Sequence, residues 1–325
     1  MKKNCLFVIF LVLAGFSVNA EDTADEAGNK NGHFFSFGAS FGMLSGESEE
    51  VLYRSGTNSY ISQLIWQINP LFYAGVDVGY GWRPANPKNV FQNIFSGFFV
   101  DASFKYGLPA NTGLMEDRDW EEAENPNWLT IYSVHNNTTE MAMLAGLDIG
   151  KSFRLYNQFR LGVFFSYNMM YYAFVATEEG SYLYPSGHSY RSGSENLVTY
   201  KQFWQILSPG ISFYGVFNNY FDIEIFFKAT PLVTVSSLDE HLGRTFQIII
   251  DPMLFGLYIE PGFVFTFKPA SKFMLSLSLN YRNISGSRGN SWHRYPDQST
   301  TYGNGGGAGF SAFDVSLTAK LRIGE

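Results

Sequence analysis

Residues 62–80 read SQLIWQINPLFYAGVDVGY, and this stretch decides the fold. Every even position from Leu64 to Tyr80 carries an apolar side chain, whereas most odd positions carry glutamine, asparagine, glycine or aspartate. Successive side chains of a β-strand point to opposite faces. The stretch therefore predicts one long strand with one apolar face and one polar, water-facing face.

The same period of two recurs near both ends of the chain. Apolar residues alternate with small or polar ones over 35–43, over 273–281 and over 313–323. In the last of these segments Asp314, Lys320 and Arg322 fall on the second face. Because charged side chains need water, we expect that face to line a hydrated lumen, with lipid outside.

About ten such segments follow one another, which is an even number, as expected of a closed bacterial barrel. They cover 33–53, 59–82, 91–107, 139–153, 157–177, 197–218, 220–237, 244–268, 272–285 and 308–323. Several exceed 20 residues and would stand about 50 Å tall, twice the ~25 Å apolar band of a membrane. We therefore predict an all-β, ten-stranded antiparallel transmembrane β-barrel that extends beyond the outer membrane.

The connections between these segments differ in length. Residues 153–157 and 218–220 are short enough for periplasmic turns, whereas the long polar stretches 108–138, 178–196 and 286–307 are typical of outer loops. Long loops on one side only are the usual arrangement in outer-membrane barrels.

The first twenty residues, MKKNCLFVIFLVLAGFSVNA, have the form of a secretory signal peptide. Two lysines precede an apolar run that is shorter than a membrane-spanning helix needs, and a small-residue cleavage site follows it. We expect residues 1–20 to be removed and residues 21–325 to form the barrel. The single cysteine, Cys5, lies in this leader, so the mature chain should contain no disulfide.

The composition supports one large β unit. Aromatic residues make up 18% of the chain and charged residues only 16%, an unusual balance for a soluble domain. The formal net charge of −7 argues against a nucleic-acid partner, because no basic face is available to neutralise phosphates.

Two groups of ionisable residues are candidates for chemistry. Asp117 and Asp119 are two positions apart, and so are Asp239 and His241. In an extended strand this spacing directs both side chains of a pair to one side. A carboxylate beside an imidazole can orient it and raise its basicity, as a water-activating base requires.

Short motifs around these residues resemble the omptin family of outer-membrane, aspartic-type endopeptidases. The similarity covers most of the mature chain, and the motifs match in order and spacing. They are Leu44-Ser45-Gly46 with Glu50, Ser62-Gln63-Leu64 with Trp66, Met115 to Trp120, Asn125-Pro126, Gly180 to Tyr184, Tyr200-Lys201-Gln202, and Ser236 to His241. Omptins are ten-stranded barrels, which agrees with the number of segments found above.

The resemblance implies a catalytic mechanism. Asp117 and Asp119 match the family's aspartate couple, and Asp239 with His241 matches its Asp-His dyad. A water held between the two pairs would attack a peptide bond at the cell exterior, with His241 as general base. No metal, cofactor or covalent nucleophile is implied.

One geometric requirement follows from the alternation. Continued strictly from Phe221, it would place Asp239 and His241 on the outer face of the barrel. For the pair to face the interior, a bulge or a strong twist must lie between Phe221 and Asp239. We predict it at Pro231, since proline in strands is confined to edges and bulges.

The expected substrate-binding residues are Glu50, Met115 and Ser237. By parity Glu50 points inward, and it matches the acid that binds a basic side chain before the cleaved bond. Family members with basic specificity carry a second acid where this chain has Ser237. Preference for arginine or lysine is therefore expected in a weakened form, because one charge-assisted contact is lost.

Omptins bind lipopolysaccharide on the outside of the barrel, and this chain departs from that site as well. Tyr167 matches one aromatic member, but Met169, Tyr171 and Phe203 stand where charged residues are expected. Our hypothesis is that the protein works in outer-membrane lipid without requiring lipopolysaccharide.

Three functions remain open at this point: a surface endopeptidase, a catalytically silent barrel acting as an adhesin or host-protein binder, and a channel. Retention of all four expected catalytic residues favours the endopeptidase. Ten strands disfavour an open pore, which usually needs about 16. His135 could line the groove, although an ordinary loop histidine is the simpler interpretation.

Overall fold

The computed structural model describes residues 32–324, apart from 55, 84–94, 123, 157, 194 and 243–245. The expected signal peptide, residues 1–20, lies outside the described residues and stays a prediction. Within the described part of the chain, no helix is long and apolar enough to cross a membrane.

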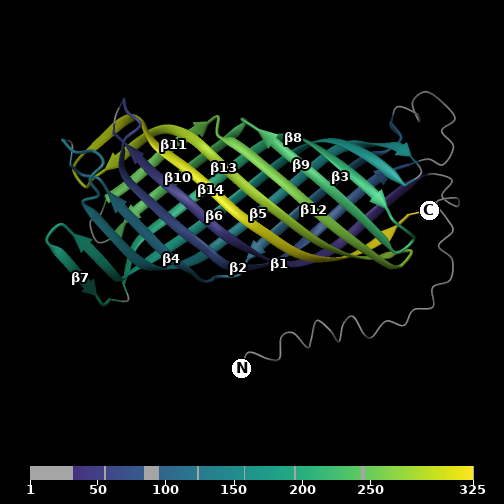
Figure 1. The fold of residues 1–325 in the computed structure, drawn as a ribbon, viewed down its shortest axis with the longest axis horizontal. Helices are drawn as coiled ribbons and strands as arrows, with labels where there is room; N and C mark the ends of the chain where they lie inside the picture. Colours follow the sequence, from purple (N-terminus) through teal and green to yellow (C-terminus); the bar gives the residue numbers. More distant parts are fainter. Residues whose placement is uncertain are drawn as a thin grey trace.

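Within the described residues, fourteen antiparallel strands form one sheet that closes into a cylinder (Figure 1). Closure is made by β1 against β14, in register from Phe35 opposite Ile323 to Leu52 opposite Gly306. The strands are β1 (His33–Tyr53), β2 (Tyr60–Trp82), β3 (Phe98–Gly107), β4 (Ala110–Asp119), β5 (Ile131–Tyr156), β6 (Phe159–Tyr184), β7 (Gly187–Arg191), β8 (Asn196–Val216), β9 (Phe221–Thr230), β10 (Val233–His241), β11 (Phe246–Leu254), β12 (Leu257–Ala270), β13 (Phe273–Arg294) and β14 (Ser299–Ile323).

These fourteen elements make a ring of ten barrel strands, which confirms the predicted fold. β4 continues β3, β10 continues β9, and β12 continues β11, so each of these pairs counts once. β7 pairs with β6 alone among the described strands and forms a protruding hairpin (Figure 1).

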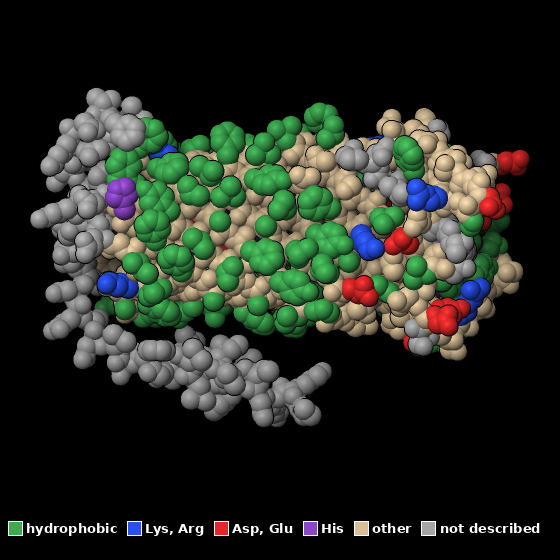
Figure 2. Space-filling view, turned by 180° about the vertical axis from the view of Figure 1, so that it is seen from behind, with side chains coloured by type: hydrophobic (Ala, Val, Ile, Leu, Met, Phe, Trp, Pro, Cys, Tyr) green, Lys and Arg blue, Asp and Glu red, His purple; other side chains and the backbone are tan. Residues whose placement is uncertain are grey.

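The two ends of the cylinder differ. We call the end where β1 begins and β14 finishes the terminal end, and the opposite end the loop end. On the face that Figure 2 shows, hydrophobic side chains cover the part nearer the terminal end, while most charged side chains gather toward the loop end. The barrel therefore has a lipid-facing part and a part that projects into water, as predicted.

β1 keeps one phase along its whole length. The odd-numbered Phe35, Phe37 and Phe41 are 46%, 50% and 55% exposed on the outside. The even-numbered Leu44 and Glu50 are fully buried inside. The predicted inward direction of Glu50 is confirmed.

β2 does not keep one phase, so the expectation of a single apolar face over 62–80 is wrong. Leu64, Trp66 and Ile68 point into the barrel and are buried, whereas Phe72 and Val76 are exposed to the outside. The reversal occurs at Asn69 and Pro70, which are both exposed. Proline has no amide hydrogen for the strand ladder, so it marks the point where pairing is interrupted.

The reversal predicted at Pro231 is present. Along β9 the even-numbered Asp222 and Lys228 are buried and Phe227 faces outward. After Pro231 and Leu232, which are both exposed, the odd-numbered Val233 and the residues that follow it at the same parity in β10 are the buried ones. Asp239 and His241 therefore turn toward the interior.

The three long outer loops are shorter than expected. Most of 108–138 belongs to β4 and to the start of β5, and most of 286–307 to β13 and β14. Within 178–196, β6 continues to Tyr184 and β7 follows. Above the membrane the outer face meets water and the inner face carries polar residues of the site, so these strands have polar residues on both sides and lose the alternation that marks a strand. His135 accordingly lies on β5 and not in a loop.

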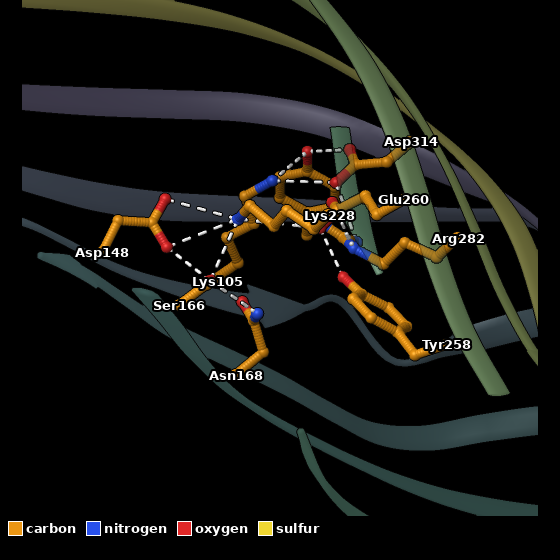
Figure 3. Close-up of polar contacts among 10 residues, drawn as sticks. Lys105, Asp148, Ser166, Asn168, Lys228, Tyr258, Glu260, Arg282 and Asp314 are labelled. Carbon is orange, nitrogen blue, oxygen red and sulfur yellow. Dashed lines mark hydrogen bonds and ion pairs between the residues drawn. The ribbon is translucent and has the colours of Figure 1, made fainter. Parts of the chain in front are cut away.

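A layer of charged side chains crosses the lumen in the lipid-facing part (Figure 3). Arg282 donates to Glu260 (2.9 Å) and pairs with Asp314 (3.1 Å). Lys105 pairs with Asp314 (2.9 Å), and Lys228 contacts Glu260 (3.7 Å). Buried charges are tolerated when they are paired in this way, and the layer links strands on opposite sides of the ring.

Fully buried aromatic rings form a second layer, nearer the loop end. Trp66 stacks on Tyr200 (centroids 5.6 Å apart) and on Phe174 (5.5 Å). Tyr172 stacks on Phe174 and on Phe310. The candidate site lies on the loop-end side of this aromatic layer.

Candidate active site

β10 brings Asp239 and His241 to the inner wall. Val235 and Ser237, at the same parity, are 0% and 5% exposed, and Asp239 is fully buried. The Nε2 atom of His241 lies 2.8 Å from Oδ2 of Asp239, and the imidazole side chain is 21% exposed. A buried carboxylate thus holds an imidazole that substrate and water can reach.

The hydrogen bond also assigns the two imidazole nitrogens. A carboxylate accepts hydrogen bonds, so Nε2 carries the proton and donates it to Asp239. Nδ1 is then the nitrogen with the lone pair. This is the tautomer that a general base needs, with the carboxylate ready to stabilise the imidazolium.

β4 carries the aspartate couple on a different wall, separated from β10 in the sheet by β5, β6 and β8. Met115 is 1% exposed and points inward, so Asp117 and Asp119, at the same parity, also face inward. Glu116 and Arg118, which alternate with these inward residues, point outward and form an ion pair (2.7 Å). Strand alternation therefore separates a paired charge outside from two carboxylates inside.

Glu50 on β1 lies near one acid of β4 and one acid of β10. Its side chain is fully buried, and neither carboxylate oxygen has a hydrogen-bond partner among the described residues. Burial, with Asp239 and Asp117 nearby, raises the pKa of the Glu50 carboxyl well above its usual range. The structure thus gathers Glu50, Asp117 and Asp239 in one acidic, cation-attracting site.

The two remaining expected binding residues lie next to these acids. Met115 occupies the inward position before Asp117 on β4, and Ser237 the one before Asp239 on β10. The Ser237 hydroxyl is buried next to Tyr200, whose pKa its hydrogen bond lowers. It is a neutral polar group directly before Asp239 in the site.

Ser133 and His135 form a buried polar pair beside the aspartate couple. Ser133 stands opposite Asp117 in the β4–β5 ladder. Its hydroxyl is 2.9 Å from Nε2 of His135, whose Nδ1 donates to the Thr177 carbonyl (3.0 Å). Burial lowers the pKa of His135, so this imidazole is neutral and supports the wall.

Sequence reasoning missed one polar cluster at the base of the site. Tyr200 and Gln202 on β8 are both fully buried, and Tyr200 stands directly opposite Asp239 in the β8–β10 ladder. Both residues belong to the Tyr200-Lys201-Gln202 motif, whose pattern indicates no role for them. Their contacts run across the lumen to β1, which no local spacing indicates.

The donors at the site are one imidazole and several carboxylates. In the residues that the structure describes, no three His, Cys, Asp or Glu side chains are placed to hold a metal ion. The geometry offers an oriented imidazole that is 21% exposed, with carboxylates of two other strands near that of Glu50. Such a set can activate and position a water molecule.

Comparisons with known proteins agree with this arrangement. The omptin family model matches residues 32–323. The plasminogen activator of Yersinia pestis is 28% identical over 250 residues, which are 75% of this chain and 74% of that protein. The crystal structure of the outer membrane protease OmpT from Escherichia coli superposes with a TM-score of 0.76 at 21% identity, over 89% of this chain and 96% of that one. The chain belongs to the omptin family of outer-membrane endopeptidases, with its active site facing the cell exterior.

Proposed function

We propose that this endopeptidase cleaves surface peptides and proteins by direct attack of water, activated by Asp239 and His241 and positioned by Asp117 and Asp119. The observation that carries the proposal is the 2.8 Å hydrogen bond between His241 and the fully buried Asp239. It fixes the tautomer and the direction of the imidazole on the inner wall. Without the reversal at Pro231 both side chains would point outward.

The reaction proceeds in two proton transfers. Nδ1 of His241 takes a proton from the water as its oxygen bonds to the scissile carbonyl carbon, and Asp239 stabilises the imidazolium that forms. Asp117 and Asp119 hold the water through its hydrogens. The imidazolium then donates its proton to the leaving amine, the C–N bond breaks, and the base is regenerated.

We propose further that the enzyme prefers a basic residue before the cleaved bond. Glu50 would accept the cationic group, with Ser237 contributing a neutral oxygen and Met115 packing against the aliphatic part of the side chain. Ser237 takes the place of a second acid, so the preference is weaker than two carboxylates would give.

Cleavage mapping tests the proposal. The full chain, refolded in detergent, is incubated with a mixed peptide pool, and the products of wild type and His241→Ala are identified by mass spectrometry. We expect cuts after lysine and arginine in the wild type alone. Identical maps for the two proteins would contradict the proposed mechanism.

We also propose that activity does not require lipopolysaccharide. On the outer face of β6, Tyr167 and Met169 are 37% and 36% exposed, and the Tyr167 hydroxyl donates to Gln205 (2.8 Å). These uncharged groups offer little to a phosphorylated lipid. We expect equal cleavage rates with and without added lipopolysaccharide, and activity only in its presence would refute this hypothesis.

A further inference from the structure

Gln202 ties two opposite walls of the barrel together. Its Oε1 accepts hydrogen bonds from Ser48 on β1 (2.6 Å) and from the Trp204 indole (2.6 Å). Its Nε2 donates to the Glu49 carbonyl on β1 (3.3 Å) and to the Tyr200 hydroxyl (3.0 Å). A glutamine amide has two donors and two acceptor lone pairs, so all four are used and the amide has one orientation.

This orientation determines what the Tyr200 hydroxyl can do. Its oxygen accepts from Gln202, so its own hydrogen must point away from that amide. The ring is held between walls by stacking on Trp66, with an interplanar angle of 11°. Burial and the negative charges of Glu50 and Asp239 raise the pKa of Tyr200. Tyr200 is therefore a protonated, oriented donor. Because Nε2 of Gln202 contacts both its hydroxyl and the Glu49 carbonyl, the tyrosine lies beside the part of β1 that carries Glu50.

We propose that Tyr200 is a specificity-determining residue, whose hydroxyl, oriented by Gln202, donates to Glu50 when that carboxylate ionises to bind a basic substrate side chain. The inference rests on the proposed preference for basic residues. It gives the pocket a second fixed polar group on the wall opposite Glu50, in addition to Ser237.

The physical need for such a donor follows from the surroundings of Glu50. The titratable groups that face it are Asp239 on β10, Asp117 on β4 and Tyr200 on β8. Two of the three are carboxylates that oppose its ionisation. A hydrogen bond to the charged form favours that form, so the Tyr200 hydroxyl lowers the cost of creating the anion that the substrate cation needs.

The test compares Tyr200→Phe with the matched control Tyr172→Phe. Phenylalanine keeps the ring stacking in both cases. Tyr172 is another fully buried tyrosine of the aromatic layer, and its hydroxyl has no hydrogen-bond partner in the part of the chain that the structure describes. Steady-state kinetics are measured from acid to neutral pH on two peptides that differ only in lysine or norleucine before the cleaved bond.

For Tyr200→Phe we expect KM for the lysine peptide to rise about tenfold, since a hydrogen bond to a charged group is lost, with kcat changed less than about twofold. The acid limb of kcat/KM for this peptide should move to higher pH. Tyr172→Phe should match the wild type, and Gln202→Leu should shift KM in the same direction as Tyr200→Phe.

Two outcomes would overturn the inference. One is Tyr200→Phe kinetics equal to wild type at every pH, and the other is an equal loss on both peptides. A wild type that cleaves both peptides equally well would remove the basic preference itself, and this failure is visible before any variant is compared.

Discussion

Two walls of the barrel change phase between the lipid-facing part and the part above it, and a third does not. Toward the terminal end, β2 turns Phe72 and Val76 to the outside, and β9 does the same with Phe227. Toward the loop end, β2 turns Leu64 and Trp66 inward, and β10 does the same with Asp239. β1 keeps a single phase throughout.

The difference shows how one barrel is adapted to lipid around its lower part and to water around its upper part. In the lower part an apolar outside faces lipid, and paired charges such as Arg282 and Asp314 fill the lumen. In the upper part the inside contains an aromatic layer and, beyond it, the acidic site of Glu50, Asp117 and Asp239. Proline at positions 70 and 231 marks the boundary in two of the strands. The lower part should therefore determine stability and the upper part activity.

The largest effect should come from Asp239→Asn. An amide would hold the wrong tautomer of His241, and such a change in an Asp-His pair costs about 10⁴-fold in kcat. The matched control is Glu240→Gln, the next residue on β10, which faces outward and pairs with Lys201 (3.2 Å). Steady-state cleavage assays should show no loss for Glu240→Gln. Equal losses in both variants would mean that the face assignment of β10 is wrong.

In the lower part we expect an effect on stability instead. Arg282→Met leaves Glu260 and Asp314 buried with fewer partners, which should lower the free energy of unfolding by about 3–5 kcal/mol. Denaturant unfolding of the refolded barrel measures this change. Arg288→Met, which removes a partly buried arginine stacked 3.6 Å from the Tyr53 ring centroid, should cost about 1 kcal/mol or less. A larger loss from Arg288→Met would contradict the division between the two parts.

Glu50→Gln should change substrate binding and its pH dependence. The raised pKa of Glu50 means that the free enzyme keeps a proton above the ordinary range, so KM for basic peptides should fall as the pH rises through this pKa. Glu50→Gln should raise KM about 30-fold, the equivalent of about 2 kcal/mol, and flatten the profile. A wild-type KM that is independent of pH would contradict this account.

The raised pKa of Glu50 also affects stability. Binding of basic peptides should improve as the pH rises, whereas the free energy of unfolding should fall. The folded chain holds a proton that the unfolded chain has released near the ordinary pKa of 4.5. The stabilising contribution is therefore complete below 4.5 and is lost as the pH rises through the folded pKa. Unfolding of the wild type and Glu50→Gln across this range should show a steeper decline for the wild type.

The smallest effect is expected from Ser237→Asp, which adds a second carboxylate to the pocket. The ratio of kcat/KM for lysine over norleucine peptides should rise about tenfold, the worth of one charge-assisted contact. Ser236→Asp, on the outer face of the same strand, is the control and should leave the ratio unchanged. An increase with Ser236→Asp would show that net charge alone is responsible.

The sequence allowed the barrel and the first strand to be predicted, because Phe35 to Met43 alternate with small polar residues and β1 never changes phase. It misled in β2, where even positions are apolar on both sides of Pro70. The reason is physical: Trp66 is apolar because it packs in the interior, and Val76 because it faces lipid. An unbroken pattern therefore conceals a reversal of faces.

The candidate site was predictable only in part. The i, i+2 spacing pairs Asp239 with His241, and parity places Glu50 inward, so local pattern suffices for these residues. Gln202 and Ser48 are 154 positions apart in the sequence, and only closure of the ring brings β8 and β1 into contact. No spacing rule reports a contact across a lumen.

The central claim is that the strand reverses its faces at Pro231 and thereby turns Asp239 and His241 inward. Single cysteines at positions 226, 227, 236 and 237, spin-labelled in the refolded barrel, test this directly by label mobility and by access to oxygen and water-soluble relaxants. We predict mobile, accessible labels at Phe227 and Ser236, and immobilised labels at Phe226 and Ser237. A mobile label at 237 with an immobilised one at 236 would mean that the alternation runs through Pro231 unchanged, and would contradict the account.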